Sequence, residues 1–175
     1  IGVTEANPDF VYLIIGLPAP NYGTEGFYKS TNSGASFTNP SSPGLGNQQW
    51  YDLCIDASPT NGNEVMIGGQ TQFIKSTNGG SLFGGSGGNT HVDYHDVNYL
   101  DGSTVYMAND GGVYVSYNNG AAWDNLSNGL AIAQMYGFGQ SSTNPNLLVQ
   151  GWQDNGTNRY NGFSWAEIMG ADGML

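Results

Sequence analysis

One eight-residue pattern recurs three times in this chain of 175 residues: Ser, any residue, Asn, any residue, Gly, two further residues and an aromatic. The copies are Ser30–Phe37, Ser76–Phe83 and Ser116–Trp123. Their closing aromatics are 46 and 40 residues apart, and Trp165 follows 42 residues later in a shortened fourth version. A regular spacing of this kind is the signature of a repeat architecture.

Each copy has the chemistry of a tight turn with an aromatic anchor. The Asn side chain can hydrogen-bond to the backbone of its own turn, and the Gly supplies a positive φ without steric cost. The closing aromatic is expected to pack beneath the turn. The six turn positions are therefore interpreted as structural: Asn32, Gly34, Asn78, Gly80, Asn118 and Gly120.

Short apolar strands precede every copy of the pattern. The runs are Val11–Ile14, Val65–Ile67, Val105–Met107 and Leu147–Val149, and before each lies another short strand that ends in a turn. Four strands per repeat, at about 40–45 residues, predict an all-β protein built of four-stranded antiparallel propeller blades.

The predicted blades cover 1–40, 50–84, 91–124 and 134–168 of a single propeller segment, 1–175, and the first contains an insertion from Leu17 to Gly26. Closed propellers use roughly 4–8 blades or more, and open sheet edges are a liability. We therefore expect about four blades of a larger propeller, with the rest of a longer chain as a partner. The start at Ile1, without an initiator Met or signal-like stretch, is read as a mature or excised segment.

Charge and composition limit the partners. The chain has fourteen acidic and three basic residues, which gives a net charge of −11. Such a surface repels phosphate backbones and anionic membranes, so nucleic acid is excluded as a partner. No apolar run is long enough for membrane insertion. Cations, neutral glycans and basic proteins fit better, and the scarcity of Lys and Arg favours a secreted or cell-surface location. The single cysteine, Cys54, is expected to be a buried, inert thiol.

The three copies resemble the Asp-box (BNR) repeat, Ser-x-Asp-x-Gly-x-x-Trp, of sialidases, xyloglucanases and sortilin-type (VPS10-like) propellers. The resemblance covers essentially the whole chain and implies a fold rather than a function. Asn stands where the Asp belongs in all three copies, which keeps the turn hydrogen bond and removes charge. The stretch from His91 to Gly173 looks like large bacterial secreted and surface Asp-box proteins. That likeness implies a type IX secretion machinery as a partner.

Blade topology predicts where function lies. In an antiparallel four-stranded blade the first and third turns lie at one end, and the second loop and the connection to the next blade lie at the other. The repeated turns occupy the first end. Polar clusters occupy the second: His91–Asp96, Asn109–Gly112, Trp152–Gly156 and Asp172. The residues predicted to bind ligand are Trp152, Gln153, Asp154, Asn155, Asp93 and Asp172. The aromatics Trp50, Tyr51, Tyr94 and Tyr136 could stack on sugar rings or serve as packing.

Two metal sites are compatible with these clusters. His91, Asp93 and His95 alternate, so in an extended segment they would share one side and could hold zinc or a similar ion. Calcium could bind through Asp93, Asp110 and Asp154, although no EF-hand spacing is present. Each of Asp110, Asp154 and Asp172 could instead only close a turn. No cofactor is required by the sequence, and calcium or another divalent cation stays open.

A catalytic role is considered for Asp110. Its context, Asn-Asp-Gly-Gly-Val-Tyr, resembles the Asp-Ile-Gly-Gly-Ala-Tyr context of a catalytic Asp in xyloglucanase-type propellers, with Gly departing at the second position. Glycoside hydrolysis needs a second carboxylate about 5–5.5 or 6.5–9.5 Å away, expected outside this chain. Sialidase activity is disfavoured because that family needs three arginines and Arg159 stands alone.

The sequence therefore predicts a ligand-binding propeller module, for a glycan or a protein, in a secreted or cell-surface bacterial protein. A glycoside hydrolase of the Asp-box propeller type, acting on a polysaccharide, is the first alternative. A structural spacer in an adhesin is the second.

Overall fold

The computed structural model describes residues 1–130 and 133–173. These residues form sixteen strands in four antiparallel sheets of four strands each, and every sheet follows chain order. The all-β prediction of four-stranded blades is confirmed. In the described ranges, no helix is long and apolar enough to cross a membrane.

The strand bounds agree with the predicted apolar runs. The first sheet contains β1 (Gly2–Val3), β2 (Val11–Gly16), β3 (Thr24–Ser30) and β4 (Thr38–Ser41). The second contains β5 (Leu53–Ala57), β6 (Val65–Gly69), β7 (Phe73–Ser76) and β8 (Gly84–Gly85). The third contains β9 (Tyr94–Tyr99), β10 (Val105–Asn109), β11 (Gly112–Ser116) and β12 (Asp124–Asn125). The fourth contains β13 (Met135–Gln140), β14 (Leu148–Trp152), β15 (Thr157–Tyr160) and β16 (Trp165–Met169).

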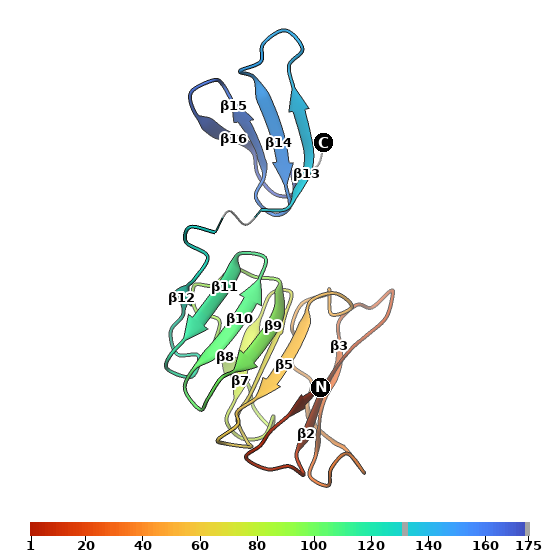
Figure 1. Cartoon of the computed structure of the whole chain (residues 1–175). Coiled ribbons are helices and arrows are strands. Elements are labelled where there is room, and N and C mark those ends of the chain that lie inside the picture. The colour runs from red at the N-terminus through yellow and green to blue at the C-terminus, as the bar shows by residue number, and fades with distance from the viewer. Residues whose placement is uncertain (131–132, 174–175) are drawn as a thin grey trace. The chain divides into compact units, whose positions relative to one another are not determined.

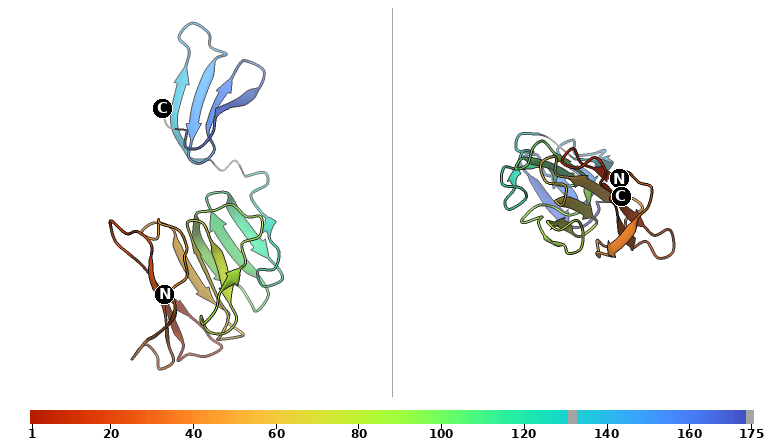
Figure 2. Two further views of the ribbon diagram at one scale, coloured as in Figure 1. Left: turned by 180° about the vertical axis from the view of Figure 1, so that it is seen from behind. Right: turned by 90° about the horizontal axis from the view of Figure 1, so that it is seen from below.

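The chain divides into two compact units, Ile1–Asn128 and Gly129–Leu175, called here the N-terminal and C-terminal units. The N-terminal unit holds the first three sheets, which lie side by side in chain order (Figure 1, Figure 2). The C-terminal unit holds the fourth sheet.

The core of the N-terminal unit lies between neighbouring blades, and β6 shows why its sequence is apolar on both faces. All five residues of β6 are buried. Val65 and Ile67 join a cluster with Tyr12 and Phe27 of the first blade. Met66 points the other way, into a cluster that includes Met107 of the third blade. A middle blade is thus covered on both sides, so alternation of apolar and polar residues disappears.

Cys54 is buried in the second of these clusters, as predicted. Burial raises the pKa of its thiol to about 12. The thiolate, which is the reactive form, is therefore disfavoured at neutral pH.

The repeated turns have the predicted hydrogen bonds. In the second copy, the Ser76 hydroxyl donates to Asn78 Oδ1 at 2.9 Å, and the Leu82 N–H donates to the same oxygen at 2.9 Å. The Gly80 N–H donates to Ser76 Oγ at 2.8 Å. Gly80 has φ +89°, and the matching glycines of the other copies, Gly34 and Gly120, have φ +85° and +80°. These turns need no ligand.

The turns also join each blade to the blade before it. Phe83 packs edge-on against Phe27 of the first blade, with ring centroids 5.1 Å apart. Trp123 packs edge-on against Phe73 of the second blade at 5.6 Å. Phe37 of the first copy is 39% exposed. The aromatic anchor therefore belongs to the joint between blades as well as to its own turn.

Candidate functional site at the loop end of the blades

In the N-terminal unit the second loops and the blade connections meet at one end of the sheets, as the topology predicts. We call this the loop end. Backbone hydrogen bonds link its segments: Gln49 N to Tyr22 O at 3.4 Å, Thr71 N to Leu45 O at 3.0 Å, Asp93 N to Gln70 O at 2.8 Å, and Asp110 N to Asp93 O at 3.3 Å. Loops that are distant in sequence are therefore fixed relative to one another.

Three carboxylates and one imidazole gather there, and we call Asp52, Asp93, His95 and Asp110 the acidic cluster. The His95 ring bridges two acids, with Nε2 at 2.7 Å from Asp110 Oδ1 and Nδ1 at 3.4 Å from Asp52 Oδ1. Carboxylate oxygens of Asp93 and Asp110 lie within 4.8 Å of each other. The four side chains come from two blade connections, the start of β9 and the β10–β11 loop.

Asp52 is the buried member of the cluster. Its side chain is 1% exposed, and His95 is its ion-pair partner. Both of its oxygens are buried. Burial, followed by the negative charge of Asp93, raises the pKa of Asp52 to about 6, while the charge of His95 acts in the opposite direction.

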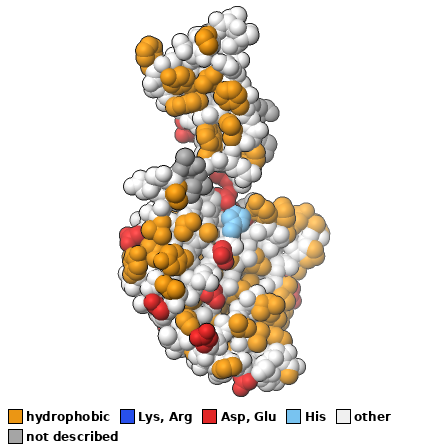
Figure 3. Space-filling view, viewed as in Figure 1, with side chains coloured by type: hydrophobic (Ala, Val, Ile, Leu, Met, Phe, Trp, Pro, Cys, Tyr) orange, Lys and Arg blue, Asp and Glu red, His pale blue; other side chains and the backbone are white. Residues whose placement is uncertain are grey.

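A row of exposed aromatic rings leads to the acidic cluster. Tyr22 and Trp50 have ring centroids 6.4 Å apart, Trp50 and Tyr51 5.6 Å, and Tyr51 stands edge-on to His95 at 5.2 Å. The side chains of Tyr22, Trp50 and Tyr51 are 40%, 65% and 56% exposed, so these rings are not buried in the core. Figure 3 shows histidine surface on the N-terminal unit bordered by acidic and hydrophobic surface. We call these three rings with His95 the aromatic row.

Tyr22 lies in the insertion of the first blade. The insertion was expected to run from Leu17 to Gly26, but β3 already begins at Thr24, so the loop itself is Leu17–Gly23. Neither Tyr22 nor Asp52 was singled out from the sequence. The available signal for Asp52 was its position directly before the apolar strand Leu53–Ile55 and after two aromatics.

The backbone interrupts the assumed alternation of His91, Asp93 and His95, and their metal-binding role stays a prediction. Asp93 has φ +59°, so the extended segment that was assumed begins only at Tyr94, the first residue of β9. His91 Nδ1 lies 3.1 Å from the Val92 carbonyl oxygen, whereas His95 belongs to the acidic cluster. Tyr94, for which sugar stacking and packing were both considered, is 4% exposed and part of the core, so it serves as packing.

The N-terminal unit supplies only some of the oxygen ligands that a divalent cation needs. Asp93 and Asp110 offer two oxygens within 4.8 Å of each other. Calcium takes about six to eight oxygen ligands, so further ligands or waters would be needed. Whether calcium or another cation binds stays a prediction.

The ligand-binding residues predicted in the C-terminal unit lie together in one corner of that unit. The Asp154 N–H donates to Asp172 Oδ1 at 3.1 Å, and Asn155 Nδ2 donates to the Gln153 carbonyl at 2.9 Å. The Trp152 carbonyl accepts from the Gly173 N–H at 2.8 Å. These bonds close turns, and the ligand-binding role of the five residues stays a prediction. Tyr136, on β13, is 45% exposed.

Comparison with family models and with curated proteins gives no match. Among solved structures, a GH74 enzyme from Niastella koreensis matches with 18% identity and a TM-score of 0.58, over 96% of this chain and 29% of that one. The GH74 xyloglucanase from Xanthomonas campestris matches with 16% identity and a TM-score of 0.57, over 98% of this chain and 31% of that one. YCF48 from Cyanidioschyzon merolae matches with 13% identity and a TM-score of 0.49, over 94% of this chain and 53% of that one.

The chain thus spans about three tenths of the length of the two GH74 proteins. Identities this low speak to the fold alone. The four sheets are blades of a β-propeller, and their number is consistent with part of a larger one.

Proposed function

We propose that the loop end binds a neutral polysaccharide chain, as part of a secreted or cell-surface bacterial protein. The observation that carries the proposal is the aromatic row, which ends at the acidic cluster. Aromatic faces stack on the apolar faces of sugar rings, and the adjacent carboxylates and imidazole can accept hydrogen bonds from sugar hydroxyls. Ligand sites commonly combine apolar or aromatic walls with a few convergent polar groups.

Charge supports a neutral ligand over an anionic one. The chain carries a net charge of −11, and three carboxylates lie in the acidic cluster itself. The chain has three basic residues, Lys29, Lys75 and Arg159. An anionic polymer would be repelled, whereas a neutral glycan would not be. Export by the type IX route remains part of this proposal.

The test uses Trp50→Ala and Tyr51→Ala. We expect each to weaken binding of a glycan identified on an array by about 3- to 10-fold, because an aromatic contact contributes about 0.5–1.5 kcal/mol. Isothermal titration calorimetry measures the loss, and a melting curve checks the fold. Phe163→Ala is the matched control, since Phe163 is 95% exposed in the C-terminal unit. Unchanged affinity in both folded variants would contradict the proposal.

Glycoside hydrolysis is the second candidate, because two carboxylates lie together in the acidic cluster. Carboxylate oxygens of Asp93 and Asp110 lie within 4.8 Å of each other, and glycoside hydrolases use a facing pair of carboxylates. Asp52 is not suited to act on substrate, because its side chain is 1% exposed. If the protein is a hydrolase, Asp110→Asn should abolish release of reducing sugar while polysaccharide binding persists. A wild-type protein that binds the glycan and releases no sugar excludes this candidate.

A further inference from the structure

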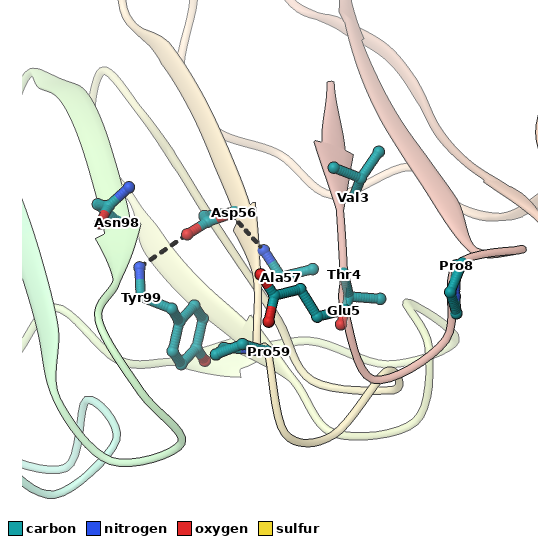
Figure 4. Close-up of a pocket in the computed structure, with 9 residues that line it drawn as sticks. All are labelled: Val3, Thr4, Glu5, Pro8, Asp56, Ala57, Pro59, Asn98 and Tyr99. Carbon is teal, nitrogen blue, oxygen red and sulfur yellow. Dashed lines mark hydrogen bonds between the residues drawn. The ribbon is translucent and has the colours of Figure 1, made fainter.

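A cavity lies at the opposite end of the N-terminal unit, away from the acidic cluster. This end, called here the turn end, holds the first turn of each blade together with the repeated turns. Backbone bonds connect the two kinds of turn: Ser33 N to Asp9 O at 2.9 Å, Gly79 N to Asn63 O at 2.9 Å and Asn119 N to Ser103 O at 2.7 Å. The cavity has a volume of about 530 Å³ and opens between the ends of β1, β5 and β9 (Figure 4). This volume is within the usual range of small-ligand sites, about 300–1,000 Å³.

The charged groups that line this cavity are both carboxylates, and Thr4 and Asn98 are among its uncharged polar side chains. Asp56 accepts hydrogen bonds from the Tyr99 N–H at 2.7 Å and the Ala57 N–H at 2.9 Å, which fixes its carboxylate between β5 and β9. Burial raises the pKa of Asp56, and these two backbone donors act in the opposite direction. None of the residues that line the cavity is Lys, Arg or His.

Glu5 is the second carboxylate, and its geometry differs from that of Asp56. Its side chain extends from the turn after β1 across the cavity toward Ala57 of β5 (Figure 4). Within residues 1–130 and 133–173, no hydrogen bond or ion pair engages the Glu5 carboxylate. Both of its oxygens are therefore available to a ligand.

Part of the cavity wall is apolar, and this part is formed by Val3, Pro8, Pro59 and the ring of Tyr99. A ligand that matches both features has an aliphatic stem and a cationic tip. Arginine side chains bury their methylene stems on apolar surface and can bind a carboxylate through two parallel hydrogen bonds.

We propose that the cavity at the ends of β1, β5 and β9 binds a basic side chain, arginine in preference to lysine, presented by a partner protein. The guanidinium group pairs with Glu5, the stem lies against Pro8 and Pro59, and Asp56 contributes negative charge from the wall. This site is separate from the proposed glycan surface. The module would then hold a glycan at the loop end and a basic protein segment at the turn end.

The test is an NMR titration of the ¹⁵N-labelled chain with Nα-acetyl-arginine methylamide. We expect saturable shifts of the Glu5, Ala57 and Tyr99 amide signals, with a dissociation constant on the order of millimolar, because one partly exposed ion pair contributes little. The citrulline analogue has the same shape without the charge and should give no saturable shift. The lysine analogue should bind more weakly.

Two variants make the test specific. Glu5→Gln should weaken binding at least about 3-fold, and Glu5→Lys should abolish it by placing a cation in the cavity. Glu25→Gln is the matched control, because Glu25 lies on β3 outside the cavity. Trp50→Ala should leave unchanged the amide shifts that the arginine compound causes. Failure of the arginine proposal can therefore be told apart from failure of the glycan proposal. Equal shifts with the citrulline analogue, or full binding by Glu5→Gln, would overturn the proposal.

Discussion

Single carboxylates acquire their roles here from neighbours that are distant in sequence. Asp93, His95 and Asp110 could be placed at one end of the blades from topology, because each adjoins a predicted loop. Asp52 could not be recognised as their partner, since its burial and its His95 contact depend on the packing of two blades. The sequence also could not show that Asp93 adopts φ +59° and interrupts the alternation of His91, Asp93 and His95.

Asp101 offers a residue-scale prediction with a defined pH dependence. The Ser103 N–H, followed by the Thr104 N–H, donates to its carboxylate at 2.7 Å and lowers its pKa to about 2. A depressed folded-state pKa stabilises the fold above the ordinary value of 3.8. That contribution is lost as the pH falls from about 4 to about 2.

We therefore expect Asp101→Asn to lower the melting temperature at pH 7, with the deficit relative to wild type shrinking between pH 4 and pH 2.5. Circular dichroism melts at these pH values measure it. Asp124→Asn, at an exposed strand position, should show no such convergence. A deficit that is the same at pH 7 and pH 2.5 would show that Asp101 acts through something other than its charge.

At the scale of elements, the repeated turn is both a hairpin closure and a joint. Its period and its Asn and Gly residues were sufficient to predict the blades and the hydrogen bonds within each turn. The partner of the closing aromatic was not predictable from the pattern, because Phe27 and Phe73 lie in the preceding blade. Ser41 Oγ adds a hydrogen bond across one joint, to the Gly80 carbonyl at 2.6 Å.

Substitutions at two glycines in equivalent turn positions can distinguish the turn's role as a hairpin closure from its role as a joint between blades. Gly34 and Gly80 have nearly the same φ, +85° and +89°. A Cβ on Gly34 would meet only Phe37 Cζ, at 3.9 Å, whereas a Cβ on Gly80 would collide with the Phe27 ring. We expect Gly34→Ala to lower the free energy of unfolding by about 1–2 kcal/mol, from backbone strain alone.

Gly80→Ala should lower the free energy of unfolding by about 1–3 kcal/mol more than Gly34→Ala, because overpacking at the joint adds to the same backbone strain. Urea denaturation of both variants gives the two free energies of unfolding. Equal costs would mean that the joint yields easily and that the aromatic contact with Phe27 contributes little to stability.

Across the whole molecule, burial is unevenly distributed between the two units. Every residue of β6 is buried, whereas every residue of β16 is exposed. Phe163 and Met169 of the C-terminal unit are 95% and 67% exposed. Composition predicted an all-β chain but could not show this asymmetry, because the apolar content of the fourth repeat resembles that of the others.

We expect hydrogen exchange to reflect that asymmetry. Amides of β6 and β10 should exchange slowest, and those of β13 and β16 should exchange much faster, since exposed backbone opens locally at little cost. Mass spectrometry of deuterated peptides measures this.

The joint described between blades has a consequence for how such a chain can grow. Phe27 and Phe73 each stand three positions before the Ser of their own turn, while Phe83 and Trp123 close the turns that contact them. One repeat can therefore carry both complementary surfaces, an accepting ring on its third strand and an inserting ring after its turn. Tandem duplication of such a repeat therefore creates a matched head-to-tail interface without any new substitution. The rotation between successive blades, rather than side-chain recognition, then determines how many blades close the propeller.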